Sequence, residues 1–104
     1  MLQGFHVDRL TTDDEIRLVL RGELDVSVVG EVEEAIGAVA SGSRVVMDVR
    51  DLSFIDSSGI RVLMTLDLRA RSEGWSLAIE QPQPAVRQVL ELCRIGERIP
   101  ILDG

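Results

Sequence analysis

Two adjacent serines, Ser57 and Ser58, are the residues of this sequence whose position best suits chemistry. They follow Asp56 and precede Gly59 and an apolar run that continues to Leu68. Asp and Ser favour helix starts because their side-chain oxygens accept the first backbone N–H groups. A helix start also attracts anions, including a phosphate attached to serine. The alternative is that this run only caps a helix, since capping is the generic role of such residues.

Three carboxylates raise a second kind of chemistry, an enzyme with a divalent cation. Asp48, Asp51 and Asp56 surround the end of a predicted strand, where α/β folds place their sites. Asp48 lies inside that strand, and the sequence has no G-x-S-x-G elbow, P-loop or metal-ligand spacing. These acids are more simply caps and solvated loop charges, so we expect no catalysis, no metal and no cofactor.

The single histidine and single cysteine restrict the chemistry further. A Ser-His-acid triad would have to use His6, which lies in a predicted first strand. With Cys93 as the only cysteine, a disulfide within the chain and a cysteine metal cluster are both excluded.

Length and composition predict one ordinary globular domain. The chain has 104 residues, 45% of them hydrophobic and 28% charged, so we expect a single domain spanning residues 1–104. A net charge of −7 argues against nucleic acid or an anionic membrane as a partner. The sequence has no signal-peptide pattern and no apolar run of membrane-spanning length. We therefore expect a cytoplasmic protein.

Hydrophobic periodicity places the elements around the serines. Alternating apolar residues predict strands, and apolar residues three and four apart predict helices. The expected order is ββαβαβα(β), an α/β fold with a mixed sheet of about four to five strands. Strands are predicted over 4–10, 15–21, 44–49 and 75–80, with helices over 28–39, from Gly59 to about 72 and from Pro84 to about 95, and a short strand or extended tail over 99–102.

Two details of these predictions concern the helices and the segments beside them. The segment Gly22–Asp25 is expected to break the second strand, and Asp25 or Ser27 to cap the first helix. In the third helix the inner apolar stripe includes Cys93, which we expect to be a small buried hydrophobe.

The second helix carries two apolar stripes, although a helix lying on a sheet needs only one. The first stripe faces the sheet and consists of Gly59, Val62, Leu63, Leu66 and Ala70. The second consists of Ile60, Met64 and Leu68, flanked by Arg61, Asp67 and Arg71. Either a neighbouring helix covers this second stripe, or it is an exposed apolar row with charged edges, as at partner surfaces.

Three segments together resemble the STAS domain, and more narrowly the bacterial anti-sigma factor antagonists. They are G-E-L-D at 22–25, D-V-R-D-L-S-F-I-D-S-S-G-I at 48–60, and the proline-started helix at 84–92. The resemblance implies a STAS-like fold over nearly the whole chain. It implies that Ser57, or alternatively Ser58, is phosphorylated by an anti-sigma factor that is also a serine kinase. The unphosphorylated form would bind that partner and release the sigma factor, and a serine phosphatase would restore it.

The second apolar stripe, whose first member Ile60 adjoins the serines, predicts the surface that meets the partner. The segment Gly22–Asp25 should lie nearby, because the second and third strands are expected to be neighbours in the sheet and to share that end. At a helix start, phosphorylation adds about −1.5 to −2 charge to an interface already rich in carboxylates, which would repel the partner. Arg61 stands where many members carry Gly, a difference that could alter partner fit. The expected partner-binding residues are Glu23, Asp25, Asp56, Ser57, Ser58, Gly59, Ile60, Arg61 and Met64.

Two further points stay open in the sequence. The chain is expected to be a monomer or a weak dimer. The alternative function is a STAS subunit of another assembly, such as a stressosome-like signalling complex or a lipid-transport complex, in which the serine is not used as a switch.

Overall fold

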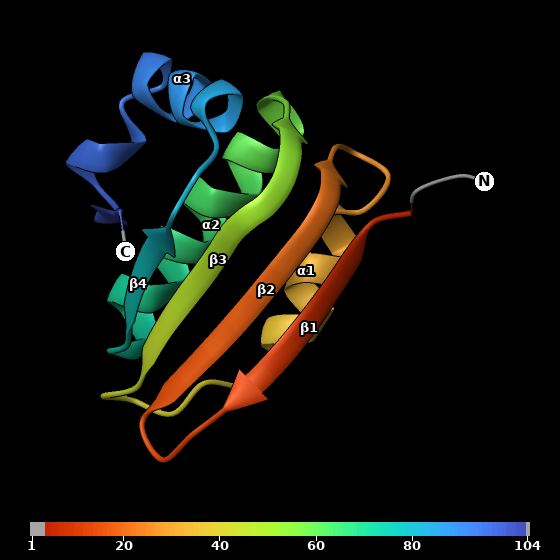
Figure 1. The fold of residues 1–104 in the computed structure, drawn as a ribbon. Helices are drawn as coiled ribbons and strands as arrows, with labels where there is room; N and C mark the ends of the chain where they lie inside the picture. Colours follow the sequence, from red (N-terminus) through yellow and green to blue (C-terminus); the bar gives the residue numbers. More distant parts are fainter. Residues whose placement is uncertain (1–3, 104) are drawn as a thin grey trace.

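A mixed five-stranded sheet in the order β1-β2-β3-β4-β5 organises residues 4–103, the part of the chain that the computed structural model describes (Figure 1). The element order ββαβαβαβ confirms the predicted α/β fold and includes the short last strand. The elements are β1 (His6–Thr11), β2 (Glu15–Leu24), α1 (Val29–Ile36), β3 (Arg44–Ile55), α2 (Ser57–Glu73), β4 (Ser76–Glu80), α3 (Pro84–Leu92), the 3₁₀ turn η1 (Ile95–Glu97) and β5 (Ile101–Leu102).

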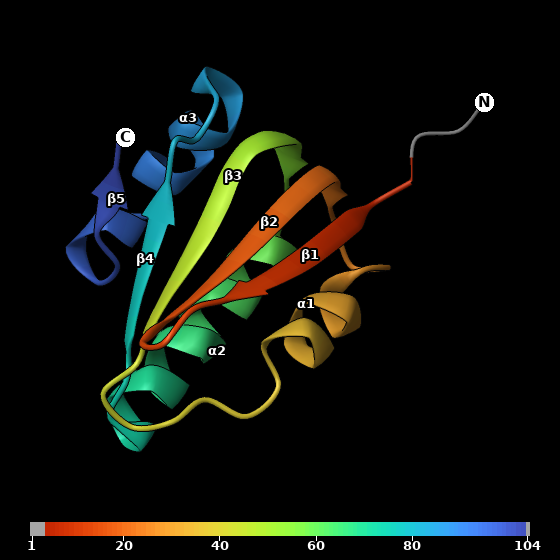
Figure 2. The ribbon, with the colours of Figure 1, turned by 60° about the horizontal axis from the view of Figure 1, so that its bottom comes forward.

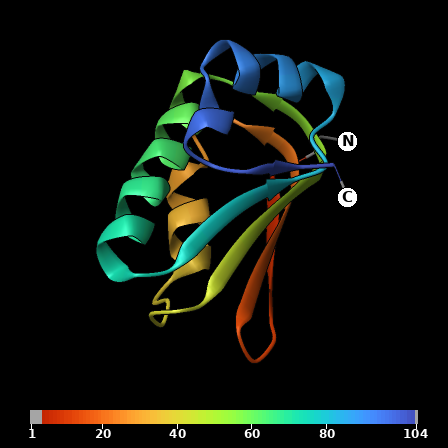
Figure 3. The ribbon, with the colours of Figure 1, turned by 90° about the vertical axis from the view of Figure 1, so that its left-hand side faces the viewer.

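The strand directions explain where the helices lie. Strands β1 and β2 form an antiparallel hairpin, whereas β2, β3, β4 and β5 run parallel to one another. A parallel pair needs a crossover connection, and each helix supplies one. Helices α1 and α2 lie together on one face of the sheet (Figures 2 and 3). Within residues 4–103, no helix is long and apolar enough to cross a membrane.

The core lies between this face of the sheet and the helices. In β2 the buried side chains of Ile16, Leu18 and Leu20 alternate with side chains that face the other way. The first apolar stripe of α2 is buried, as predicted, from Gly59 to Ala70. Burial of these aliphatic groups supplies most of the stabilising free energy, since each fully buried side chain contributes about 1.5–3 kcal/mol.

The second and third strands are both longer than the sequence predicted. Strand β2 continues through Gly22 to Leu24, because Gly22 adopts a φ of 101° and the pairing register shifts there instead of ending. Strand β3 continues to Ile55, so no loop separates it from α2. Its last part pairs only with β2, since the pairing with β4 ends at Asp48. Because β4 does not cover this part of β3, exposed polar residues are tolerated in it. These polar residues are the reason that the sequence did not predict a strand here.

Helix α1 ends earlier than predicted, at Ile36 instead of Val39. Gly37 follows it with a φ of 58°, a conformation that glycine adopts readily. The last turn contains no basic residue. Two arginines from other elements serve its carbonyl groups instead. Arg9 of β1 donates to the oxygens of Ala35 and Ile36, and Arg69 of α2 donates to the oxygen of Gly37.

The prediction that Cys93 is buried is wrong. Helix α3 ends at Leu92, and Cys93 forms its C-cap with an exposed side chain. The buried positions of this helix are Val86 and Leu90. The chain then turns at Arg94, which has a φ of 57°, so Cys93 leaves the apolar stripe that its spacing suggested.

Asp67 also differs from its predicted place beside the exposed stripe, because it is buried. Its carboxylate accepts hydrogen bonds from Arg71 Nε at 3.1 Å and from Arg98 Nε at 3.0 Å. The acid therefore ties the middle of α2 to the segment that follows η1.

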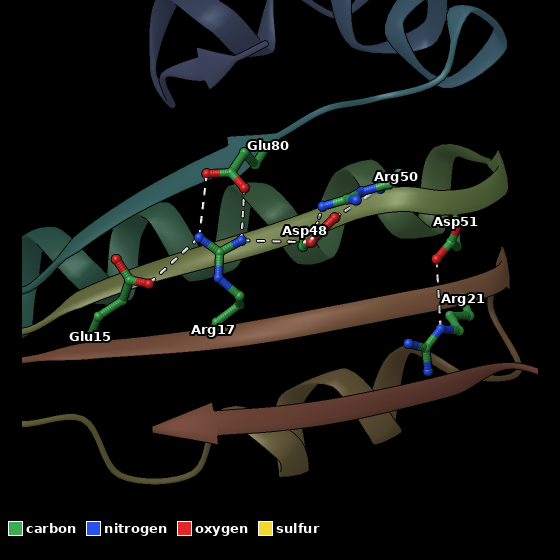
Figure 4. A network of polar contacts seen from close by, with 7 residues as sticks. All are labelled: Glu15, Arg17, Arg21, Asp48, Arg50, Asp51 and Glu80. Carbon is green, nitrogen blue, oxygen red and sulfur yellow. Dashed lines mark hydrogen bonds and ion pairs between the residues drawn. The ribbon is translucent and has the colours of Figure 1, made fainter. Parts of the chain in front are cut away.

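A single arginine spans the sheet face opposite the helices (Figure 4). Arg17 of β2 lies in register with Val46 of β3, and its guanidinium reaches Glu80 of β4, with Nη1–Oε1 and Nη2–Oε2 distances of 2.7 and 3.4 Å. The side chain must therefore cross β3. Val46 is fully buried even though no described helix covers this face. Asp48, 3.6 Å from Arg17 Nη1, completes the network with Arg50.

This pairing makes the stability of the fold depend on acidity. The hydrogen bond from Arg17 holds the pKa of Glu80 below its ordinary value. Unfolded Glu80 therefore binds a proton at higher pH than folded Glu80. The pair then contributes stability that is present above about pH 5 and is lost as the pH falls through the lowered pKa.

We predict that Glu80→Gln removes about 1 kcal/mol from the free energy of unfolding at pH 7. Its stability should also fall less steeply than that of the parent between about pH 5 and pH 3, because the depressed carboxyl is gone. Urea unfolding at a series of pH values measures both effects. Glu91→Gln is the control, since Glu91 is exposed and takes part in no ion pair within residues 4–103. Parallel curves for Glu80→Gln and the parent would contradict the prediction.

Candidate functional site

The serine pair occupies the first turn of α2, and Asp56 is the residue that caps it. Asp56 Oδ1 accepts the backbone N–H groups of Ser58 at 2.9 Å and Gly59 at 3.2 Å. Ser57 is the first helical residue and its side chain is exposed, whereas Ser58 is half-buried. The predicted helix start is therefore confirmed. The sequence suggested Asp or Ser as the cap, and the structure shows that the cap is Asp56. The two backbone N–H groups that were expected to face an anion are therefore already bound to its carboxylate.

Gly59 lets this helix start lie close to the sheet. A Cβ at this position would lie 2.6 Å from Ile55 Cγ1 and 3.0 Å from Leu24 Cγ. Both distances are shorter than ordinary contacts, so a larger residue would push α2 away from β2 and β3. Gly59 is buried on the side of α2 that faces β2 and β3. It is among the predicted partner-binding residues, and in the structure it sets the position of the serines.

The segment containing Glu23 and Asp25 lies beside the serine pair, as the sequence predicted from neighbouring strands. Glu23 pairs with Phe54 at the end of β3, and the N–H of Asp56 donates to Leu24 O at 3.3 Å. Asp25 Oδ1 accepts the backbone N–H of Ser27 at 3.0 Å and its hydroxyl at 2.6 Å, within the segment before α1. The prediction that Asp25 or Ser27 caps this helix is wrong, because its N-cap is Val28 and no side chain caps it. The carboxyl ends of β2 and β3 thus bring both motifs to one end of the sheet (Figure 1).

A hollow of about 190 Å³ lies next to the serines, between α1 and α2. Ser58, Arg61 and Thr65 of α2 line one side of it, and Val29 and Glu33 of α1 line the other. The α1 side of this hollow was not among the residues predicted from the sequence. The available signal was Val26, which also lines the hollow and is an apolar residue in a polar segment, with 70% of its surface exposed.

The second apolar stripe of α2 is partly core and partly surface. Ile60 and Met64 are half-buried and pack against the edge of the core, while Leu68 is 60% exposed. No helix among residues 4–103 fully covers this row. Of the two interpretations, the structure therefore favours an apolar row that is partly exposed. Ile60 and Met64 lie about one and two turns beyond Ser57, so the partly exposed row begins at the start of α2.

Charge around the serines is predominantly negative. None of the ion pairs found within residues 4–103 involves Glu23, Asp25, Glu31, Glu33 or Glu34. Elsewhere on the molecule most carboxylates are paired with arginine, as in the network around Arg17 (Figure 4). The end of the sheet that carries Ser57 therefore offers a field that attracts basic groups of a partner.

The three carboxylates that suggested a cation site do not converge. Asp48 pairs with Arg17 and Arg50, Asp51 lies 3.7 Å from Arg21 Nε, and Asp56 caps α2. Within the described residues, no group of three or more His, Cys, Asp or Glu side chains could hold a metal ion.

The family model described as "Mlab, STAS domain" matches residues 7–103. The chain belongs to the STAS domain family. The predicted resemblance is therefore confirmed at the level of the family.

Solved structures of anti-sigma factor antagonists share this fold. A candidate antagonist from Thermotoga maritima is 20% identical, with 94% of this chain and 86% of that chain covered and a TM-score of 0.84. An antagonist from Mycobacterium paratuberculosis is 22% identical, with coverage of 97% and 87% and a TM-score of 0.80. The antagonist SpoIIAA in its unphosphorylated form is 25% identical, with coverage of 94% and 87% and a TM-score of 0.73. Its phosphorylated form from Bacillus is also similar, with a TM-score of 0.58.

We predict that Gly59→Ala destabilises this STAS domain by about 1–2 kcal/mol. Alanine is the better helix former by about 1 kcal/mol, but the added methyl group overpacks the contact with Ile55 and Leu24. Gly30→Ala in α1 is the matched control, because a Cβ there meets no atom within 4 Å. That change should leave stability unaltered or raise it. Urea unfolding measures both variants, and equal effects of the two changes would show that the close approach at Gly59 is unimportant.

Proposed function

We propose that this STAS domain is an anti-sigma factor antagonist controlled by phosphorylation of Ser57. In its unphosphorylated form it binds an anti-sigma factor that is also a serine kinase, which frees the sigma factor. The observation that carries the proposal is the exposed Ser57 side chain at the first position of α2, beside the Asp56 cap. The similarity to SpoIIAA, an antagonist solved in unphosphorylated and phosphorylated forms, supports it.

The proposed partner surface combines the start of α2 with the segment after β2. Ile60 and Met64 supply apolar contacts, and Glu23, Asp25 and Asp56 supply negative charge for a basic partner surface. Phosphorylation puts about −1.5 to −2 further charge, and the bulk of a phosphoryl group, at Ser57. Desolvation and repulsion at the centre of an interface need supply only about 1.4 kcal/mol for each tenfold loss of affinity. Ser57 is the proposed phosphate acceptor, and Ser58 is the alternative.

In this proposal the domain is a binding module and not an enzyme. The kinase and a serine phosphatase perform the chemistry, and the domain uses no metal or cofactor. The proposed location is the cytoplasm, and the proposed state is a monomer or weak dimer.

The second candidate function is a STAS subunit of another assembly, such as a lipid-transport or stressosome-like complex. The observation that favours it is the description of the matching family, which is Mlab and not an antagonist. In that case the same surface could bind a partner without any phosphate being transferred to Ser57.

Phosphate transfer separates the two functions. The partner is first recovered from the native cell with Ser57→Ala as bait, then purified and incubated with the parent protein and ATP. Intact mass should rise by one phosphate, and tandem mass spectrometry should place it on Ser57. A phosphate on Ser58 would contradict the assignment of the residue. A purified partner that binds tightly but transfers no phosphate would favour the second candidate.

We predict that Ser57→Asp weakens binding to the purified partner at least tenfold, because it places a charge inside the interface. Ser72→Asp is the matched control, since Ser72 is exposed near the other end of α2. It should change affinity less than twofold. Isothermal titration calorimetry measures both. Similar losses in the two variants would mean that net charge, and not the position of Ser57, controls binding.

We also predict that Ile60→Ala weakens partner binding at least tenfold, since truncating a central apolar anchor typically costs about 2 kcal/mol or more. Ile60 is only half-buried, so the loss of folding stability should be modest, roughly 1 kcal/mol. Leu92→Ala on α3 removes a 77% exposed leucine and should leave binding unchanged. Normal binding by a folded Ile60→Ala variant would place the interface elsewhere.

A further inference from the structure

Arg61 lies one helical turn beyond Ser57 and faces the same side of α2. Residues four apart on a helix are neighbours about 6 Å apart along the axis, and helical side chains lean toward the N-terminus. Arg61 is exposed, and it lines the hollow between α1 and α2 together with Ser58 and Glu33. The side chain therefore starts from a position that reaches the first turn of its own helix.

Arg61 also differs from most arginines of the protein because its guanidinium is not paired with a carboxylate in residues 4–103. Within residues 4–103 it takes part in no ion pair, whereas Arg17, Arg69 and Arg71 each bind a carboxylate. The acid that shares its hollow is Glu33, and the two groups form no ion pair either. A guanidinium placed in this way remains available to a stronger anion.

A phosphate at position 57 would need such a cation. The backbone donors of Ser58 and Gly59, which an anion at a helix start would normally use, already bind Asp56. Asp56 itself presents a like charge to the phosphate. Further carboxylates at this end of the molecule are those of Glu23, Asp25 and Glu33. The helix start alone is therefore a poor site for a doubly charged group.

We propose that Arg61 is the counter-charge of phosphorylated Ser57, and that phosphorylation draws its guanidinium out of the hollow toward the phosphate. This inference rests on the proposed phosphorylation of Ser57 and describes how that site is regulated. The planar guanidinium can bind two phosphate oxygens at once. A phosphate of charge about −1.5 to −2 attracts it more strongly than the single charge of Glu33. Phosphorylation then changes the partner surface twice, by adding an anion and by removing a cation from the hollow.

The pKa of the phosphate tests this pairing without any kinase or partner. Phosphoserine is installed at position 57 during translation, and ³¹P NMR follows the second ionisation, which lies near pH 6 in an unpaired phosphoserine. We expect this pKa to be lower in the parent than in Arg61→Gln by roughly 0.3 unit or more. The difference should shrink at high salt, because exposed charges are screened.

Arg44→Gln is the matched control for the loss of one positive charge. Arg44 is exposed and lies at the start of β3, whereas α2 begins after the other end of that strand. It should leave the phosphate pKa unchanged, while Arg61→Lys should restore only part of the shift. Equal pKa values in the parent and Arg61→Gln, or equal effects of the two glutamine variants, would overturn the proposal.

The result can be separated from the proposed function itself. Because the phosphate is installed during translation, the titration reports on Arg61 whether or not any kinase modifies Ser57. A failed phosphate transfer together with a shifted pKa would therefore reject the switch in this protein and keep the pairing. A successful transfer without a pKa shift would support phosphorylation of Ser57 and reject its pairing with Arg61.

Discussion

The hydrogen bonds of Asp56 are the constraint on which the rest of the site depends. Strand β3 passes into α2 without a loop, and one carboxylate accepts the N–H groups of Ser58 and Gly59, which the first helical turn leaves unpaired. The N–H of the same residue binds Leu24, which fixes the end of β2 to the same point. Gly59, directly after the serines, removes the side chain that would otherwise hold the helix away from the sheet. Ser57 is consequently presented at a junction of two strands and a helix, with no loop between β3 and α2.

The sequence predicted those features that depend on local pattern. The buried stripe of α2 follows from a 3.6-residue period, and the strand from Glu15 onward follows from alternation of Ile16, Leu18 and Leu20. The side-by-side placement of the Glu23 segment and the serine pair followed from assuming that β2 and β3 are neighbours. The STAS family was recognisable because three motifs occur in order along one short chain. Modification of Ser57 depends on a kinase, which is a different protein, and therefore does not follow from this sequence or its fold.

What the sequence could not predict depends on contacts between distant residues. The polar end of β3 forms a strand because β2 supplies a partner for it, and Cys93 leaves its helical stripe because the chain turns at Arg94. Val46 is buried in register with Arg17, whose side chain reaches from β2 to β4. An arginine and a glutamate separated by 63 positions give no periodic signal. The hollow beside the serines was missed for the same reason, since its walls come from two helices.

Helix α1 forms one wall of that hollow. Its stability depends largely on side chains from other elements. It is eight residues long, no side chain caps its start, and its last carbonyls are held by Arg9 and Arg69 from other elements. A helix of this length is marginal by itself in water. Separation of β1 from the sheet would withdraw Arg9, so β1 and α1 should open together as one cooperative unit in native-state hydrogen exchange. Such an opening would remove one wall of the hollow while β3 and α2 kept the serine in place. The protein therefore joins a helix start held by two strands to a neighbouring wall that is able to yield.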